Sequence, residues 1–147
     1  KDEAKVIVST DRDFFQLVDS NTTIYRPVKT KENPKGEMID MDYMVEKEDV
    51  FPPNYALLKA IVGDKSDNIS GISGVGEKSV KRDFPPLSTN EDMDVDSVLE
   101  YAHNQKNKKY QKYIDNEELI RRNYKIVQLL DIDVNIQSIQ AISLDLS

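Results

Sequence analysis

Two pairs of aspartates stand out in this sequence because of their spacing and their surroundings. Asp64 and Asp67 lie three residues apart, directly before the glycine-rich stretch Gly71–Gly76. Asp11 and Asp13 lie two residues apart, at the end of a short apolar run. Carboxylate oxygens suit Mg²⁺ and Mn²⁺, and two such ions about 3.5–4 Å apart can activate water and stabilise a leaving oxygen. The two pairs together predict a divalent-metal site of the kind that cleaves nucleic acid.

The glycine-rich stretch Gly71–Gly76 is predicted to form an anion-binding turn. Glycine permits positive φ angles and lets the backbone approach a ligand closely. Consecutive amides in such a turn, followed by a helix beginning at Glu77, attract phosphate groups. Lys78 and Lys81 would then reach neighbouring phosphates. The alternative is a plain helical hairpin that binds no ligand.

The aspartates also have an interpretation without a metal. Asp11 would cap a helix and Asp13 would lie in its first turn, whereas Asp64 and Asp67 would be exposed loop residues. The occurrence of both pairs in one short chain favours metal binding. An EF-hand starting at Asp64 is excluded, because Ile69 occupies the position that requires glycine.

Three segments of the chain resemble the 5′ nuclease family, which includes flap endonucleases, the 5′-exonuclease domains of bacterial DNA polymerases, and phage ribonuclease H. Residues 63–78 follow the pattern Gly-Asp-x-x-Asp-Asn-x-x-Gly-x-x-Gly-x-Gly-Glu-Lys. The stretches Ser9–Phe14 and Leu119–Lys125 are also similar to that family and stand in the right order. The resemblance extends over residues 5 to 130, and the phage-like members are the most similar.

The resemblance implies phosphodiester hydrolysis by metal-bound water at 5′ ends, at flaps or on RNA primers. It implies two Mg²⁺ or Mn²⁺ ions per complete site, and a K⁺ ion at the carbonyls of the glycine turn. The substrate would be duplex or flap DNA, or an RNA–DNA hybrid. The implied metal ligands and catalytic residues are Asp11, Asp13, Asp64 and Asp67. The implied duplex contacts are Gly74, Gly76, Lys78, Ser79 and Lys81.

The sequence departs from the family pattern at its N-terminal side. Family members place further metal ligands, and a basic residue for the scissile phosphate, upstream of the strand that precedes Asp11. We therefore expect the C-terminal half of a nuclease that is inactive alone and needs its N-terminal half, as one chain or as a partner. The alternatives are a non-catalytic duplex-binding module and a ribonuclease of related fold.

Composition limits the class of protein. The 147 residues are 38% apolar and 32% charged, and they include no cysteine, which fits a reducing cytoplasm. No apolar run approaches the ~20 residues of a membrane span, so no membrane partner is expected. The net charge of −7 is unusual for a DNA-binding protein, but affinity depends on where the cations cluster. The basic clusters are Lys78–Arg82, Lys106–Lys112 and Arg121–Lys125.

The predicted fold is mixed α/β, with the C-terminal part of a PIN-like 5′ nuclease sheet in residues 1–50. A helical DNA-binding domain with a helix–turn–helix element follows in residues 51–147. The apolar patterning predicts four strands, at Val6–Ser9, Thr22–Tyr25, Val28–Lys31 and Glu37–Ile39. The predicted helices are Arg12–Val18, Asp42–Val45, Pro53–Val62, Glu77–Asp83, Val95–Asn104, Tyr110–Asp115 and Asn116–Leu130. The tail Val134–Ser147 is poorly patterned.

Two further groups allow two interpretations each. The segment Tyr101–Tyr113 alternates aromatic residues with lysines, so it either follows a nucleic-acid strand or forms a solvated face with its tyrosines packed inward. Arg121 and Arg122 either contact DNA or pair with the glutamates that begin the same helix. His103 is not expected to take part in the chemistry.

Overall fold

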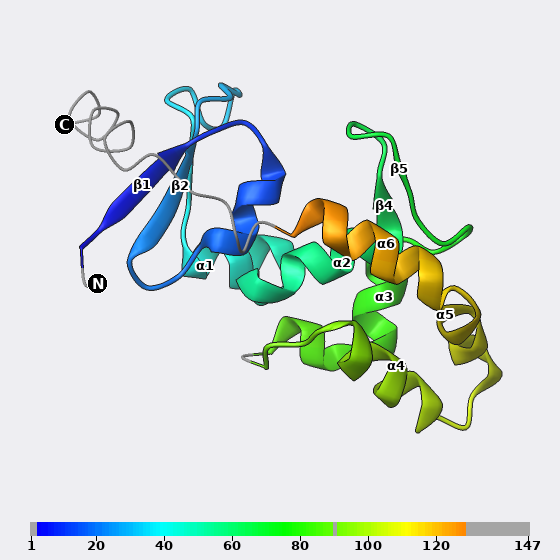
Figure 1. Cartoon of the computed structure of the whole chain (residues 1–147). Coiled ribbons are helices and arrows are strands. Elements are labelled where there is room, and N and C mark those ends of the chain that lie inside the picture. Colours follow the sequence, from blue (N-terminus) through cyan, green and yellow to red (C-terminus); the bar gives the residue numbers. More distant parts are fainter. Residues whose placement is uncertain (1–2, 90, 129–147) are drawn as a thin grey trace. The chain divides into compact units, whose positions relative to one another are not determined.

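The structure, a computed structural model, describes residues 3–89 and 91–128 (Figure 1). The described residues form two compact units, of which unit 1 ends at Pro52 and unit 2 comprises Pro53–Gln128. The predicted tail Val134–Ser147 and the last residues of the final predicted helix lie outside the described residues. None of the described helices is long and apolar enough to cross a membrane.

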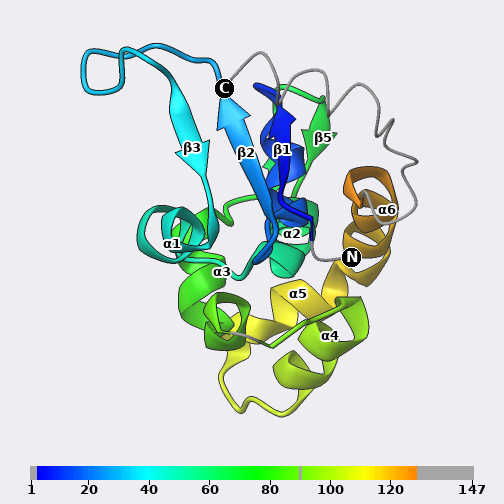
Figure 2. The same cartoon turned by 90° about the vertical axis from the view of Figure 1, so that its left-hand side faces the viewer.

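Unit 1 is built on a three-stranded sheet in the order β1-β2-β3 (Figure 2). β1 (Lys5–Val8) runs parallel to β2 (Thr22–Arg26), and β3 (Glu37–Ile39) pairs with β2 in the antiparallel direction. The register aligns Ile7, Ile24 and Ile39 in one row, and all three side chains are buried. β-branched side chains pack well in such a row, which explains why these segments form strands.

Short helices connect and follow the strands of unit 1. The segment after β1 forms the 3₁₀ helix η1 (Arg12–Leu17), which buries Phe15 in the core. α1 (Met41–Tyr43) continues directly into one turn of π-helix, η2 (Met44–Glu48). The ring of Phe15 meets that of Tyr43 edge to face, with the ring centroids 6.3 Å apart.

The predicted strand Val28–Lys31 is wrong. Pro27 follows β2 directly and has no amide hydrogen for a strand ladder. The chain instead forms an exposed turn, in which the Thr30 amide donates to the Asn33 carbonyl at 3.1 Å. β3 alone pairs with this side of β2.

Unit 2 consists of helices around one hairpin. η3 (Pro52–Asn54) leads into α2 (Tyr55–Val62), six of whose eight residues are buried, and the small hairpin β4 (Gly63–Asp64) and β5 (Ile69–Ser70) follows. The last helix, α6 (Glu117–Val127), packs against α2 (Figure 1). The remaining elements are α3 (Glu77–Asp83), η4 (Pro85–Ser88), α4 (Val95–His103), η5 (Lys108–Tyr110) and α5 (Gln111–Asp115). The predicted helices of this unit are confirmed to within a few residues at their ends.

An aromatic cluster fills the end of unit 2 that α4 and α5 share. The ring of Phe84 lies 4.7 Å from Tyr113, 5.5 Å from Tyr101 and 5.7 Å from Tyr110, measured between centroids. Tyr110 and Tyr113 are buried. The tyrosines of this segment therefore pack inward, as the second of the two interpretations predicts.

Candidate functional site

The acidic pair of unit 1 is arranged by local hydrogen bonds. The Asp11 amide donates to the Ser9 hydroxyl at 3.0 Å, and Oδ1 of Asp11 accepts a hydrogen bond from the Asp13 amide at 2.9 Å. Asp11 is therefore the N-cap of η1, and Asp13 lies in its first turn. This is the capping arrangement that the sequence offers as an alternative. It occupies one carboxylate oxygen of Asp11 and leaves Oδ2 outside the capping bond.

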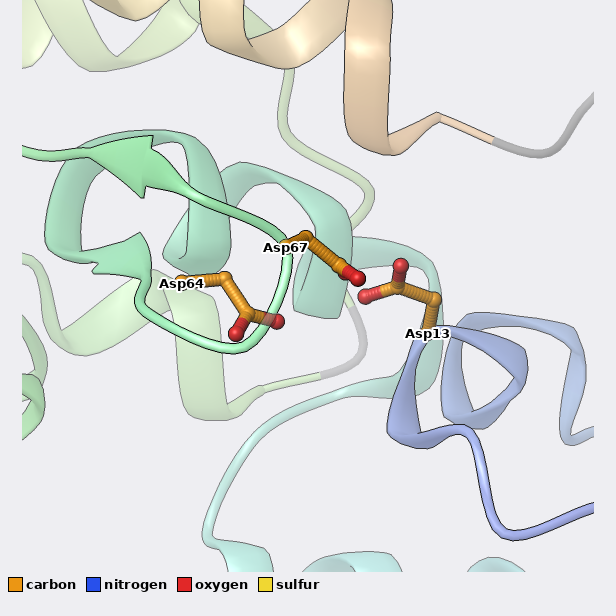
Figure 3. Close-up of side chains that lie close together, drawn as sticks. All are labelled: Asp13, Asp64 and Asp67. Atoms are coloured by element: carbon orange, nitrogen blue, oxygen red, sulfur yellow. The ribbon is translucent and has the colours of Figure 1, made fainter.

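The acidic pair of unit 2, Asp64 and Asp67, lies on the small hairpin that follows α2 and not on a helix end. Gly63 has a φ of 83° and ends α2, because its left-handed backbone turns the chain away from the helix axis. Asp64 lies in β4, opposite Ile69 of β5, and Asp67 lies in the connection between the two strands. Figure 3 shows these two side chains on the hairpin, and it also labels Asp13 of η1.

The carboxylate of Asp64 is held in a fixed orientation by Ser66. Its Oδ1 accepts hydrogen bonds from the Ser66 hydroxyl at 2.6 Å and from the Ser66 amide at 3.0 Å. These bonds, with help from the positive charge of Lys59, outweigh partial burial and hold the pKa of Asp64 below its usual value. Asp64 is thus ionised at neutral pH, and its second oxygen lies outside the Ser66 bonds.

The hairpin is pinned to the end of α2 by a close backbone approach. A Cβ atom on Gly71 would lie 2.1 Å from the carbonyl carbon of Val62, and one on Gly63 would lie 2.3 Å from the Gly71 amide nitrogen. Real side chains never come this close to a backbone, so both positions require glycine. Gly71 therefore serves the packing of the protein on itself, and not the approach to a ligand that the sequence suggests.

A buried side chain from α6 fixes the same hairpin. The Asn123 amide group donates to the Ala60 carbonyl at 3.0 Å and to the Ser70 carbonyl at 2.8 Å, and the residue is only 2% exposed. It thus joins α2, β5 and α6 at one point. No local pattern predicts this role of Asn123, although the residue lies in a segment that resembles the 5′ nucleases.

The glycine turn begins directly after the hairpin and is open to solvent. The Ile72 amide donates to the Ile61 carbonyl at 2.9 Å, which fixes the start of the turn to α2. Gly74 has a φ of 77°, and a Cβ atom on Gly74 or on Gly76 would meet nothing within 4 Å. The turn therefore has the positive φ that was predicted, at Gly74, and space at both glycines for an incoming group.

The turn and Asp64 line one hollow on the surface of unit 2. Its walls are the end of α2, the hairpin with Asp64 and Asn68, and the backbone from Ser70 to Val75. The two halves of the long sequence motif thus face the same space.

α3 places the predicted basic contacts after the turn. Lys78 is exposed, whereas Ser79 and Lys81 are half-buried. Glu77 does not compete for these cations, because its carboxylate pairs with Lys59 at 3.8 Å. Lys78 therefore presents a positive charge in the first turn of α3, next to the open glycines.

For Arg121 of α6, the structure decides between DNA contact and pairing with a glutamate. Arg121 pairs with Glu117 at 2.9 Å and also contacts Asp96 of α4. Its side chain thus joins α4 and α6, as the pairing interpretation predicts.

The chain is similar to known nucleases in both sequence and structure, although no family model matches it. It is 41% identical over 73 residues to DNA polymerase I of Streptococcus pneumoniae (strain ATCC BAA-334 / TIGR4), which covers 50% of this chain and 8% of the polymerase. It is 38% identical over 82 residues to a 5′-3′ exonuclease of Mycoplasmopsis pulmonis (strain UAB CTIP), which covers 55% of this chain and 26% of the exonuclease.

A mutant T5 5′-exonuclease matches 87% of this chain and 48% of its own, with a TM-score of 0.66 and 25% identity. The chain is therefore similar in fold to 5′ nucleases. A bacteriophage T5 flap endonuclease, solved as a pseudo-enzyme-product complex with DNA and metal ions, matches with a TM-score of 0.63 and 26% identity, over 87% of this chain and 43% of its own. The chain thus spans less than half the length of these 5′ nucleases, and the predicted mixed α/β fold is confirmed.

Sequence reasoning missed the residues that support the site. Ser66 orients Asp64, Lys59 lowers its pKa, and Asn123 anchors the hairpin. Only Ser66 carries a local signal, because an aspartate commonly accepts a hydrogen bond from the backbone amide two residues further on. The other two act across the fold.

Proposed function

We propose that the chain supplies part of a metal-dependent 5′ nuclease, which hydrolyses phosphodiester bonds at 5′ ends, at flaps or on RNA primers during DNA replication and repair. The observation that carries the proposal is the arrangement of unit 2. An ionised, oriented carboxylate at Asp64 and an open glycine turn line the same hollow. One side suits a cation and the other suits a phosphate backbone.

The proposed metal ligands are Asp11, Asp13, Asp64 and Asp67, of which the last three are drawn in Figure 3. Mg²⁺ or Mn²⁺ fits this donor set, because all four groups offer hard carboxylate oxygens and Ser66 leaves Oδ2 of Asp64 available. When bound, two such ions would supply an activated water and would stabilise the leaving oxygen. Ser66 contributes by holding the Asp64 carboxylate ionised and in one orientation before the cation arrives.

The proposed duplex contacts are Gly74, Gly76, Lys78, Ser79 and Lys81, and a K⁺ ion at the turn carbonyls is part of the proposal. Open glycines let a phosphate approach the backbone, and Lys78 adds a charge within the next turn. Such contacts are made to the phosphate backbone of DNA and do not recognise its base sequence. Binding should therefore be independent of sequence and should weaken steeply as salt rises.

We further propose that residues 1–50 belong to the α/β nuclease domain and residues 51–147 to the DNA-binding domain. Catalysis would need the N-terminal half, because the family carries further metal ligands there. The four aspartates of this chain supply only part of the ligands that are needed to fix two ions around a phosphate. The chain alone should then bind duplex DNA but not cut it.

The first test measures Mn²⁺ binding to the chain by electron paramagnetic resonance. Asp64→Asn should weaken the affinity about tenfold or more, because the ligand charge is lost while the shape is kept. Asp42→Asn, an exposed aspartate of α1, is the matched control and should leave the affinity unchanged. If the Asp64→Asn variant and the wild type bound Mn²⁺ with equal affinity, Asp64 would not be a metal ligand.

The second test assays a 5′-flap substrate with Mn²⁺, first with the chain alone and then with the N-terminal half of a phage 5′ nuclease added. We expect cleavage only in the mixture, and a loss of about 100-fold or more with Asp64→Asn. Robust cleavage by the chain alone would contradict the incomplete site. Duplex binding without cleavage in either case would favour the alternative, a non-catalytic duplex-binding module.

A further inference from the structure

We propose that Lys106, Lys108 and Lys112 form a second DNA-binding surface, the lysine surface, which extends the grip of α3 along the phosphate backbone of the same duplex. The inference rests on the proposed duplex binding by the glycine turn and α3. It adds a separate element, the segment from the end of α4 through η5 to α5. The glycine motif does not include that segment.

The charge of this segment is unlike that of the rest of the chain. Residues 103–114 contain four lysines and no acidic residue, although the whole chain has a net charge of −7. Like charges gathered on one surface repel one another and raise the free energy of the folded protein. A polyanion such as duplex DNA relieves that repulsion and releases its own bound counterions.

The aromatic cluster decides which way this segment faces. Tyr110 and Tyr113 are buried against Phe84, and this inward packing leaves Lys106 and Lys108 turned toward solvent. Lys106 and Lys108 are exposed, and Lys112 is half-buried. The ammonium group of Lys112 lies 5.3 Å from the centroid of the Tyr113 ring.

Hydrogen bonds fix the lysine surface to the end of α3. The Tyr110 hydroxyl donates to the Asp83 carbonyl at 2.8 Å, and the Tyr113 hydroxyl donates to Oδ2 of Asp83 at 2.7 Å. Asp83 is the last residue of α3, and Lys78 lies on the exposed side of the same helix. A helix of this length extends only about 10 Å, so the lysine surface begins where the positive charge of α3 ends.

Lys109 has a different role from its neighbours. Its ammonium group pairs at 2.9 Å with the fully buried carboxylate of Asp83. Burial raises the pKa of Asp83, but hydrogen bonds from Tyr113 and Lys109 outweigh it and leave that pKa below its usual value. Lys109 therefore neutralises a buried charge inside the protein and is left out of the lysine surface.

The test is fluorescence anisotropy with labelled duplex DNA over a range of salt concentrations, with EDTA present so that no cleavage occurs. The triple variant Lys106→Gln, Lys108→Gln, Lys112→Gln should bind at least tenfold more weakly than the wild type. It should also lose about two to three units of the slope of log affinity against log salt, which corresponds to three phosphate contacts. The matched triple variant with arginine at the same positions should keep the slope.

A control with one substitution is Lys125→Gln on α6, which also removes one lysine charge. Lys125 lines a hollow together with Asp94, Asp96 and Arg121, whose charges balance. The slope should stay within about half a unit of the wild type, since no phosphate contact is lost. Lys109→Gln should instead lower the melting temperature, because it removes the closer of the two cations that pair with the buried Asp83 carboxylate.

The outcomes separate this inference from the proposed function. A slope that falls with Lys78→Ala but not with the triple glutamine variant would overturn the lysine surface and leave the proposed function intact. Absence of duplex binding by the wild type would overturn the proposed function itself. A triple variant that loses affinity for single-stranded but not for duplex DNA would overturn the assignment to the duplex.

Discussion

The acidic loop of unit 1 and the acidic hairpin of unit 2 carry the same kind of side chain but are held in different ways. Around Asp11, the contacts join residues two apart in the chain, such as Ser9 with Asp11 and Asp11 with Asp13. The hairpin of Asp64 is held by backbone contact with the end of α2 and by Asn123, which is distant in sequence. The first loop is shaped by its own sequence, and the second by the fold around it.

Because of this difference, the two loops should respond differently to substitutions elsewhere in the chain. A locally built turn keeps its conformation when distant residues change. The hairpin, by contrast, transmits changes in α2 or α6 to Asp64, because both helices hold it. If the comparison is right, substitutions far from the hairpin in sequence should disturb it, whereas the loop of unit 1 should respond mainly to its own residues.

The largest expected effect comes from Gly71→Ala. The added Cβ atom would meet the Val62 backbone at 2.1 Å, and backbone cannot move aside as a side chain can. We expect a loss of about 3 kcal/mol in the free energy of unfolding, measured by urea denaturation. Gly76→Ala is the matched control, with nothing within 4 Å, and should change stability by less than about 0.5 kcal/mol. Similar losses in both variants would mean that the close approach does not hold the hairpin.

A smaller effect is expected from Asp11→Ala in unit 1. The substitution removes the side chain that caps η1, which costs about 1 kcal/mol of stability in comparable helix caps. Asp11→Asn keeps an acceptor oxygen and should recover most of the loss. The measurement is again urea denaturation. If Asp11→Ala proved as costly as Gly71→Ala, the distinction between a local and a long-range construction would fail.

The smallest effect is a change of pH dependence in Ser66→Ala. Loss of the Ser66 hydroxyl bond should raise the pKa of Asp64 toward its usual value of 3.8, as measured by NMR titration of the Asp64 carboxyl group. Because folding lowers this pKa, the carboxylate stabilises the fold above its unfolded pKa. That stabilisation is lost as the pH falls through the folded pKa.

The Ser66→Ala variant should therefore be less stable than the wild type at neutral pH. The difference in the free energy of unfolding should shrink in acid. Ser66→Thr keeps the hydroxyl and serves as the control. A pKa of Asp64 that is the same in Ser66→Ala and the wild type would show that Ser66 does not orient the carboxylate. The hairpin would then be positioned by its backbone contacts alone.

Local patterns predicted most of the secondary structure of both units. Apolar β-branched residues gave β1 and β2, and the glycine-rich stretch marked the start of α3 at Glu77. The errors arose where local signals were incomplete. Val28–Lys31 has strand-like residues, but Pro27 and the pairing of β3 exclude it from the sheet.

The sequence by itself determined the kinds of chemical group this protein carries, their order along the chain and their resemblance to the 5′ nucleases. Those properties depend on residue type and spacing, which are written in the chain. Only the tertiary structure decided that Gly71 packs against Val62, that Asn123 anchors the hairpin, and that Lys109 neutralises Asp83 while its neighbours face solvent. These are contacts between residues far apart in sequence, and their partners are fixed only when helices pack and bury the groups that must be satisfied.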